Sequence, residues 1–179
     1  DDHEPDDASW SGQALNLPLV QGADVCGEIV SLGECVDKER IGQRVLIEPC
    51  LREANNAILD KPWYFGSECN GGFAQYTVVA SRHAYGVDST YEDIELASFP
   101  CSYSTAENML TRSQVNAGES VLVTGASGGV GSAAVQLAKA RGARVIAVTN
   151  ASKAAALREI GADRTLARDD DYAEFLGKD

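Results

Sequence analysis

The residues with the clearest chemical meaning form a glycine-rich turn after an apolar segment. Residues 121–123 lead into the run Thr124-Gly125-Ala126-Ser127-Gly128-Gly129-Val130-Gly131, and apolar residues at helical spacing follow. A strand, such a turn and a helix start together bind the pyrophosphate of a dinucleotide, because the helix start offers unpaired N–H groups and a positive dipole end. We therefore expect a dinucleotide to contact Ala126, Ser127, Gly128, Gly129 and Val130.

The spacing inside this turn predicts a separate task for two of its glycines. It reads Ala126-x-Gly128-x-x-Gly131, with alanine where the first glycine usually stands. Gly128 allows the backbone to approach a pyrophosphate, and Gly131 allows the helix to pack closely on the strand. Ser132 follows Gly131 where the phosphate loop of an NTPase needs a lysine, so that kind of site is disfavoured.

The end of the next predicted strand bears on which nicotinamide dinucleotide is bound. An NAD enzyme typically carries Asp or Glu there, to bond the 2′-hydroxyl of the adenosine ribose. Here Thr149 stands 18 residues after Gly131, and Ser152 and Lys153 follow it. Hydroxyls and a lysine attract a 2′-phosphate that a carboxylate would repel, which favours NADP(H). The alternative is that Lys153 is only the first residue of a solvent-exposed helix.

Two regions with different patterns must position these residues. Up to about residue 98 the sequence predicts short strands over 25–30, 44–47 and 73–79, with a polar loop over 52–62. Short strands separated by Gly and Pro are typical of a small barrel or sandwich. Cys26 is expected to pack as a small apolar residue, and His83 to lie at the surface.

The second region alternates strands and helices. Ser104 or Thr105 is predicted to cap a helix that runs to about Gln114. The order β-α-β-α-β is half of a doubly wound parallel sheet. We therefore expect one domain over 1–98 and another over 99–179. The strands of the second are predicted at 121–124, 144–148 and 164–167, and its helices at 129–141 and 154–160.

Composition excludes several classes of function. The 179 residues include 27 acidic and 15 basic side chains, a net charge of −12. Residues 1–10 carry −5 and residues 169–179 carry −4, which leaves −3 for the middle. Without a basic stripe the chain is not expected to bind nucleic acid. No apolar run approaches the ~20 residues of a membrane-spanning helix, so a membrane partner is not expected either.

The cysteines and the chain ends predict a cellular context. Five cysteines make an odd number without a Cys-x-x-Cys pair, and no signal-peptide pattern opens the sequence. Free thiols in a reducing compartment, the cytoplasm, are therefore expected. Because Met109 is the only methionine, Asp1 is not expected to be the natural start of the protein.

Five ordered motifs resemble the medium-chain dehydrogenase/reductase superfamily over about residues 17–168. The resemblance implies part of a GroES-like β-barrel catalytic domain followed by the first half of a Rossmann domain, within a longer, homo-oligomeric protein. The motifs are Gly22-Ala23-Asp24-Val25-Cys26-Gly27, Gly42-Gln43-Arg44-Val45, Gly71-Gly72-Phe73-Ala74-Gln75-Tyr76, Ser104-Thr105-Ala106 and the turn from Gly125 to Gly131.

The resemblance also implies an activity and three further site residues. Members transfer hydride between a nicotinamide and a small-molecule carbonyl, alcohol, enone or quinone, and the glycine turn is similar to the NADPH-using quinone reductase form. Thr105 matches a threonine near the nicotinamide ribose. Lys153 and Arg168 match residues near the 2′-phosphate of NADP(H).

Zinc is the point at which the sequence departs from the zinc-dependent branch. Cys101 matches one zinc ligand, but Ala23 replaces the histidine and Asp24 stands where a glutamate follows it. A catalytic zinc takes three protein ligands, so zinc is not favoured; if it binds, Cys101 and Asp24 are the candidate ligands. Asp24 and Cys101 are also the catalytic candidates. The alternatives are a zinc alcohol dehydrogenase and a non-catalytic NADPH-binding homologue.

Overall fold

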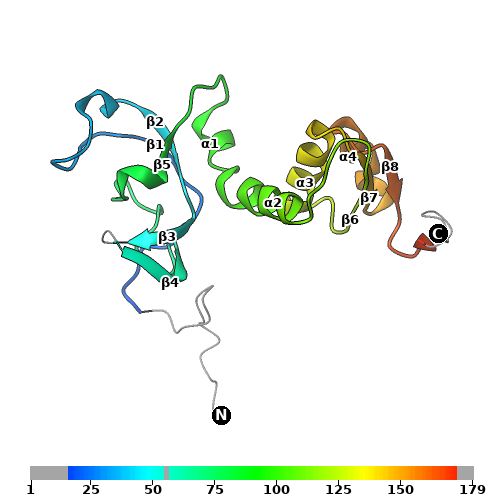
Figure 1. The fold of residues 1–179 in the computed structure, drawn as a ribbon, viewed down its shortest axis with the longest axis horizontal. Coiled ribbons are helices and arrows are strands. Elements are labelled where there is room, and N and C mark those ends of the chain that lie inside the picture. The colour runs from blue at the N-terminus through cyan, green and yellow to red at the C-terminus, as the bar shows by residue number, and fades with distance from the viewer. Residues whose placement is uncertain (1–15, 55–56, 173–179) are drawn as a thin grey trace, which may run out of the picture. The chain divides into compact units, whose positions relative to one another are not determined.

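The computed structural model describes residues 16–54 and 57–172 (Figure 1). Residue contacts divide the chain into two compact units, 1–101 and 102–179. Within the described residues no helix combines the length and the apolar character needed to cross a membrane.

Antiparallel strands make up the first unit. β1 (Cys26–Glu28), β2 (Arg44–Ile47) and β5 (Ala84–Gly86) form a sheet in the order β1-β2-β5. β3 (Cys50–Ala54) pairs with β4 (Ala57–Tyr64), and α1 (Asp93–Leu96) follows β5. Alternate residues of β2 point into the core, as period-2 packing requires. This core consists of Val45, Ile47, Leu51, Phe65 and Ala84.

The second unit is a parallel sheet with helices. α2 (Pro100–Arg112) begins in the first unit and continues into the second. The sheet order is β6 (Ser120–Val123), β7 (Arg144–Val148) and β8 (Arg164–Leu166), with all pairs parallel. α3 (Gly129–Ala140) connects β6 to β7, and α4 (Ala154–Glu159) connects β7 to β8. The predicted β-α-β-α-β order is confirmed.

β7 is buried on both faces, whereas β6 is not. Val145 and Ala147 pack in one cluster with the α3 alanines, and Ile146 and Val148 pack in a second cluster with Leu166. Such two-sided burial explains the continuous apolar sequence of β7. β6 is also apolar after its first residue, but only its last residue is buried. β6 is an edge strand of the described sheet, which accounts for the difference.

The prediction of a loop over 52–62 is wrong. These residues lie mostly in β3 and β4, which form an antiparallel pair. Leu51 pairs with Trp63 and Glu53 pairs with Ile58, so four residues of β4 oppose a single residue of β3. Pro62, which argued against a strand, lies inside this irregularity, where its missing N–H breaks no regular ladder.

The prediction of a strand over 73–79 is also wrong. None of these residues is in a strand, although the local sequence favours one. Tyr76 is 74% exposed and Val78 is 93% exposed. A strand needs a partner, and within the part of the chain that the structure describes residues 73–79 form no strand ladder, although the Phe73 N–H donates to the Gln21 carbonyl oxygen. The first strand is also shorter than predicted, since it covers 26–28 rather than 25–30.

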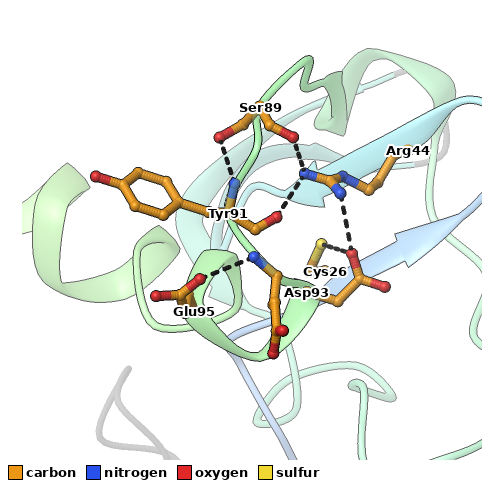
Figure 2. A network of polar contacts seen from close by, with 7 residues as sticks. Cys26, Arg44, Ser89, Tyr91, Asp93 and Glu95 are labelled. Atoms are coloured by element: carbon orange, nitrogen blue, oxygen red, sulfur yellow. Dashed lines mark hydrogen bonds and ion pairs between the residues drawn. The ribbon is translucent and has the colours of Figure 1, made fainter.

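Arg44 ties the first sheet to the segment that leads into α1 (Figure 2). Its Nη2 donates to the carbonyl oxygens of Ser89 at 2.8 Å and Tyr91 at 3.0 Å, and its Nη1 lies 3.6 Å from the Asp93 carboxylate. The same carboxylate lies 3.7 Å from the Cys26 sulfur. Cys26 therefore makes a polar contact, whereas the sequence predicts only apolar packing for it. Burial, and then this carboxylate, raise the pKa of the thiol.

His83, predicted at the surface, is buried instead. Only 9% of the residue is exposed, and its Nε2 lies 3.3 Å from the Glu53 carbonyl oxygen. The short 3-10 helix Ser81–His83 places its ring against β3. A buried imidazole with a backbone partner is part of the packing of this unit.

Asp163 is expected to make the stability of the second unit depend on pH. Its carboxylate accepts hydrogen bonds from Lys139 Nζ and, at 2.8 Å, from the Val145 N–H, and both lower its pKa below the usual value. A lowered folded-state pKa stabilises the fold above the ordinary carboxyl pKa near 4, and this stabilisation is lost as pH falls through the lower folded value. Asp163→Asn is therefore expected to flatten the pH dependence of urea unfolding below about pH 4. Glu159→Gln, at an exposed carboxylate of the same unit, should leave that dependence unchanged; an equal effect would contradict the assignment.

Candidate cofactor-binding site

One residue of the glycine-rich turn is buried and bonded to β7, whereas the residues after it are exposed to solvent. Ala126 is completely buried, and its N–H donates to the Val148 carbonyl oxygen at 3.3 Å. The Gly128 N–H donates to the Gly125 carbonyl oxygen at 3.0 Å and closes the turn. Ser127, Gly128 and Gly129 are exposed. The turn therefore presents an accessible backbone surface on a fixed base.

The start of α3 carries the features of an anion site. Its N-cap residue is Gly128, which has no side chain to cap the helix, and no acidic residue lies in the first turn. The N–H groups of a first helical turn have no partners inside the helix. A phosphate group is well suited to satisfy them, because it accepts hydrogen bonds and interacts favourably with the helix dipole.

Two glycines of the turn face different surroundings. A Cβ on Gly131 would lie 2.3 Å from the Gly125 oxygen and 2.7 Å from the Ala126 Cα. A Cβ on Gly128 would meet only the Gly125 oxygen, at an ordinary 3.5 Å. Gly131 therefore packs closely, as predicted, but against residues 125–126 of the turn rather than against the strand. The protein itself leaves room at Gly128 for a methyl group without a close internal contact.

Thr149 carries a buried hydroxyl group that has no hydrogen-bond partner among the described residues. The residue follows β7, is 4% exposed, and donates its N–H to the Leu166 carbonyl oxygen at 2.9 Å. Within the described residues its Oγ1 makes no hydrogen bond. An unsatisfied buried hydroxyl costs about 1–3 kcal/mol, so such groups usually have a partner. A bound ribose or phosphate oxygen at this strand end would be one.

The two predicted cations follow neighbouring strand ends. Ser152 and Lys153 lie in the 3-10 helix Ala151–Lys153 after β7, and Arg168 lies two residues after β8. All three are exposed. Because β6, β7 and β8 are parallel, their carboxyl ends share one edge of the sheet, and the turn, Thr149 and both cations gather there. Acidic residues follow Arg168, among which Asp170 accepts the Ala167 N–H at 2.8 Å.

α2 differs from its prediction at the start. It begins at Pro100 rather than at a cap formed by Ser104 or Thr105. Proline suits the first helical position, where its fixed φ is helical and its missing N–H costs nothing. Thr105 therefore lies inside the helix, half-buried, and the next residue, Ala106, is fully buried in the core of the second unit.

α2 contacts α3 along its length, through residues that the sequence reasoning did not single out. The Ser102 hydroxyl lies so near Gly129 that a Cβ there would come within 2.7 Å of it. Gln136 Nε2 donates to the Tyr103 hydroxyl at 2.9 Å, and Arg141 Nη2 donates to the Thr111 hydroxyl at 2.9 Å. Early residues of α2 thus meet the start of α3, and later residues meet its end.

Asp24 and Cys101, the catalytic candidates, lie together. Asp24 Oδ1 accepts the backbone N–H of Cys101 at 2.7 Å, so this carboxylate contacts the start of α2. The described residues contain no group of three His, Cys, Asp or Glu that could hold a metal ion. Since a catalytic zinc takes three protein ligands and Ala23 offers none, the donor set among those residues does not fit a zinc site.

Known proteins match both parts of the chain. Residues 3–89 match the family model of the alcohol dehydrogenase GroES-like domain, and residues 129–178 match that of zinc-binding dehydrogenases. The acryloyl-coenzyme A reductase of Metallosphaera sedula is 35% identical over 85% of this chain and 48% of its own. A chloroplastic NADPH-dependent alkenal/one oxidoreductase of Arabidopsis thaliana is 34% identical over 82% of this chain and 36% of its own.

Solved structures agree with these relatives. A crystal structure of a candidate alcohol dehydrogenase from Sinorhizobium meliloti superposes with a TM-score of 0.81 and 46% identity, over 90% of this chain and 45% of that one. The chain spans about half the length of the first curated relatives it matches. A GroES-like domain followed by part of a Rossmann-type parallel sheet, as expected, is confirmed. The chain belongs to the medium-chain dehydrogenase/reductase superfamily.

Proposed function

We propose that this chain provides the NADP(H)-binding site of an oxidoreductase that transfers hydride between the nicotinamide and a carbonyl, alcohol, enone or quinone, without a catalytic zinc. The observation that carries the proposal is the Thr149 hydroxyl, which has no partner in the part of the chain that the structure describes and lies on the same sheet edge as the start of α3, where no side chain caps the helix. A dinucleotide offers a ribose and a pyrophosphate at a spacing that such an edge accommodates.

Different residues of this sheet edge would bind different groups of the dinucleotide. First-turn N–H groups of α3 would bind the pyrophosphate, and the room at Gly128 allows its close approach. The Thr149 hydroxyl would bond the adenosine ribose or its phosphate. Lys153 and Arg168 would neutralise a 2′-phosphate, which is why we propose NADP(H) rather than NAD(H). When bound, the nicotinamide supplies or accepts the hydride.

The relatives support an oxidoreductase and leave the choice of cofactor to the residues. One is named an NADPH-dependent alkenal/one oxidoreductase, whereas a protein of Sulfolobus acidocaldarius is named an NAD-dependent alcohol dehydrogenase. In this chain a carboxylate is absent from positions 149 to 153, where an NAD enzyme typically has one. The zinc-free part of the proposal rests on Ala23, which offers no ligand atom.

Calorimetric titration of the chain with NADPH and with NADH tests cofactor binding. Saturable one-to-one binding with a clear preference for NADPH is expected, and no binding of either would overturn the proposal. NADPH oxidation with aldehydes, enones and quinones then tests turnover. Tight NADPH binding without turnover of any of them would favour a non-catalytic homologue. Stoichiometric zinc that survives dialysis would overturn the zinc-free assignment.

Thr149→Val is expected to separate stability from binding. Valine fills nearly the same space without a hydroxyl, so removing this unsatisfied polar group should raise the free energy of unfolding by about 1 kcal/mol. If the hydroxyl bonds the cofactor, NADPH affinity should fall by about tenfold. Urea unfolding and calorimetry measure the two effects. Thr149→Ser, which keeps the hydroxyl, is the control and should bind NADPH nearly as well as the wild type.

A further inference from the structure

The first turn of α2 is held by a residue far away in the sequence. Pro100 has no N–H group, and α2 has no acidic residue in its own first turn. Asp24 supplies the missing acidic group, because its carboxylate accepts the Cys101 N–H at 2.7 Å at the helix start. A carboxylate at a helix N-terminus satisfies an unpaired donor and interacts favourably with the dipole.

The backbone on both sides of Asp24 is fixed. On one side, the Gln21 and Gly22 carbonyl oxygens each accept a backbone N–H from residues 72–73 at 2.8 Å. On the other side, the Val25 carbonyl oxygen accepts the Ile47 N–H at 3.1 Å. The Val25 side chain packs so closely on Gly72 that a Cβ there would come within 2.2 Å. Asp24 is therefore presented to α2 from a rigid segment.

The turn that Asp24 holds leads directly to residues of the candidate site. Ser102, the next residue, touches Gly129 at the start of α3. Thr105 lies one helical turn after Cys101, so it is on the same face of α2. Holding the Cys101 N–H therefore fixes the register from which both side chains project.

We infer that Asp24 is a positioning residue, which caps α2 from a distance and sets the placement of Thr105, and that it acts neither as a proton donor nor as a metal ligand. The evidence for the cap is the hydrogen bond that the Asp24 carboxylate accepts from the Cys101 N–H. The consequence for Thr105 rests on the proposed function, because it assumes that Thr105 lies near a bound cofactor.

Amide hydrogen exchange on the full chain tests the cap. Asp24→Ala should speed exchange of the Cys101 amide by about fivefold or more, whereas Asp24→Asn, whose amide oxygen still accepts, should stay within about twofold of the wild type. Asp37→Ala is the matched control, because Asp37 accepts the Glu39 N–H at 3.0 Å and caps a 3-10 helix elsewhere in the first unit. It should leave Cys101 unchanged. Unchanged exchange in Asp24→Ala, or an equal loss in Asp24→Asn, would overturn the inference.

Exchange in the presence of NADPH tests the consequence for Thr105. In the wild type NADPH should slow exchange both at Val130 and at Thr105. In Asp24→Ala the protection at Val130 should persist while that at Thr105 is lost, and Asp24→Asn should restore it. Protection retained at both positions in Asp24→Ala would overturn the positioning role. Absence of protection anywhere in the wild type would instead contradict the proposed function and leave the Cys101 result as the separate test of the cap.

Discussion

Gly131→Ala is expected to destabilise the second unit by about 3 kcal/mol, near the upper end of the effects usual for overpacking. The added methyl group would lie 2.3 Å from the Gly125 oxygen and 2.7 Å from the Ala126 Cα, and these are backbone atoms that cannot rotate away. Ala126 is completely buried, so the turn can yield only if β6 and α3 separate. Urea unfolding followed by circular dichroism measures the change, and NADPH binding should be lost with it.

Gly128→Ala is the matched comparison, because it adds the same methyl group three residues earlier. Its Cβ would meet only the Gly125 oxygen at 3.5 Å, so the free energy of unfolding should change by less than about 1 kcal/mol. If the turn binds a pyrophosphate as proposed, NADPH affinity should nevertheless fall by about tenfold or more, because the methyl group would hinder the close approach of the pyrophosphate to the backbone. Equal stability losses in the two variants, or unchanged NADPH affinity in Gly128→Ala, would contradict the proposed use of the turn.

The second unit was predictable because its signals are local. β7 is apolar at every position that is buried, and its predicted bounds, 144–148, match the structure. The helix predicted over 129–141 is α3, which ends at Ala140, one residue earlier than expected. In both cases the spacing of the apolar residues and a flanking glycine determine the element. The apolar side chains are then buried against the neighbouring elements of the parallel sheet.

The first unit was less predictable because pairing decides its strands. Residues 73–79 have the composition of a strand but no partner among the described residues, whereas β4 contains Pro62 and is still a strand because β3 pairs with it. Pairing between segments is not encoded in either segment alone. The cap on α2 escaped prediction for the same reason, since Asp24 and Cys101 are separated by 77 positions.

The candidate site shows the same division. The residues proposed to bind the cofactor could be chosen from the sequence, because residues that follow parallel strands meet at one sheet edge. The lack of a partner for the Thr149 hydroxyl among the described residues could not be predicted, because it depends on the three-dimensional positions of all the neighbouring polar groups. The catalytic half could not be assigned from spacing either. Asp24 was chosen for its place in a motif, and the structure shows it bonded to backbone at a helix start.

Lys153→Glu should weaken NADPH binding by about 10- to 100-fold and NADH binding by about threefold or less. A charged hydrogen bond contributes about 1.5–3 kcal/mol, and the substitution replaces it with repulsion of the 2′-phosphate. NADH has no such phosphate, so the substitution affects its binding only through the overall electrostatic potential of the protein. Calorimetric titration with both cofactors at fixed ionic strength measures the ratio, which added salt should reduce.

Arg144→Glu is the control for this charge reversal. Arg144 is exposed and begins β7, so it lies at the opposite, amino edge of the same sheet. It makes the same change in net charge as Lys153→Glu, and it should weaken NADPH binding by no more than about twofold. If the two variants weaken NADPH equally, the effect comes from net charge and not from a phosphate at Lys153. If Lys153→Glu weakens NADPH and NADH equally, Lys153 does not contact the 2′-phosphate, and Arg168 at the end of β8 would be left as the cation that could select NADP(H).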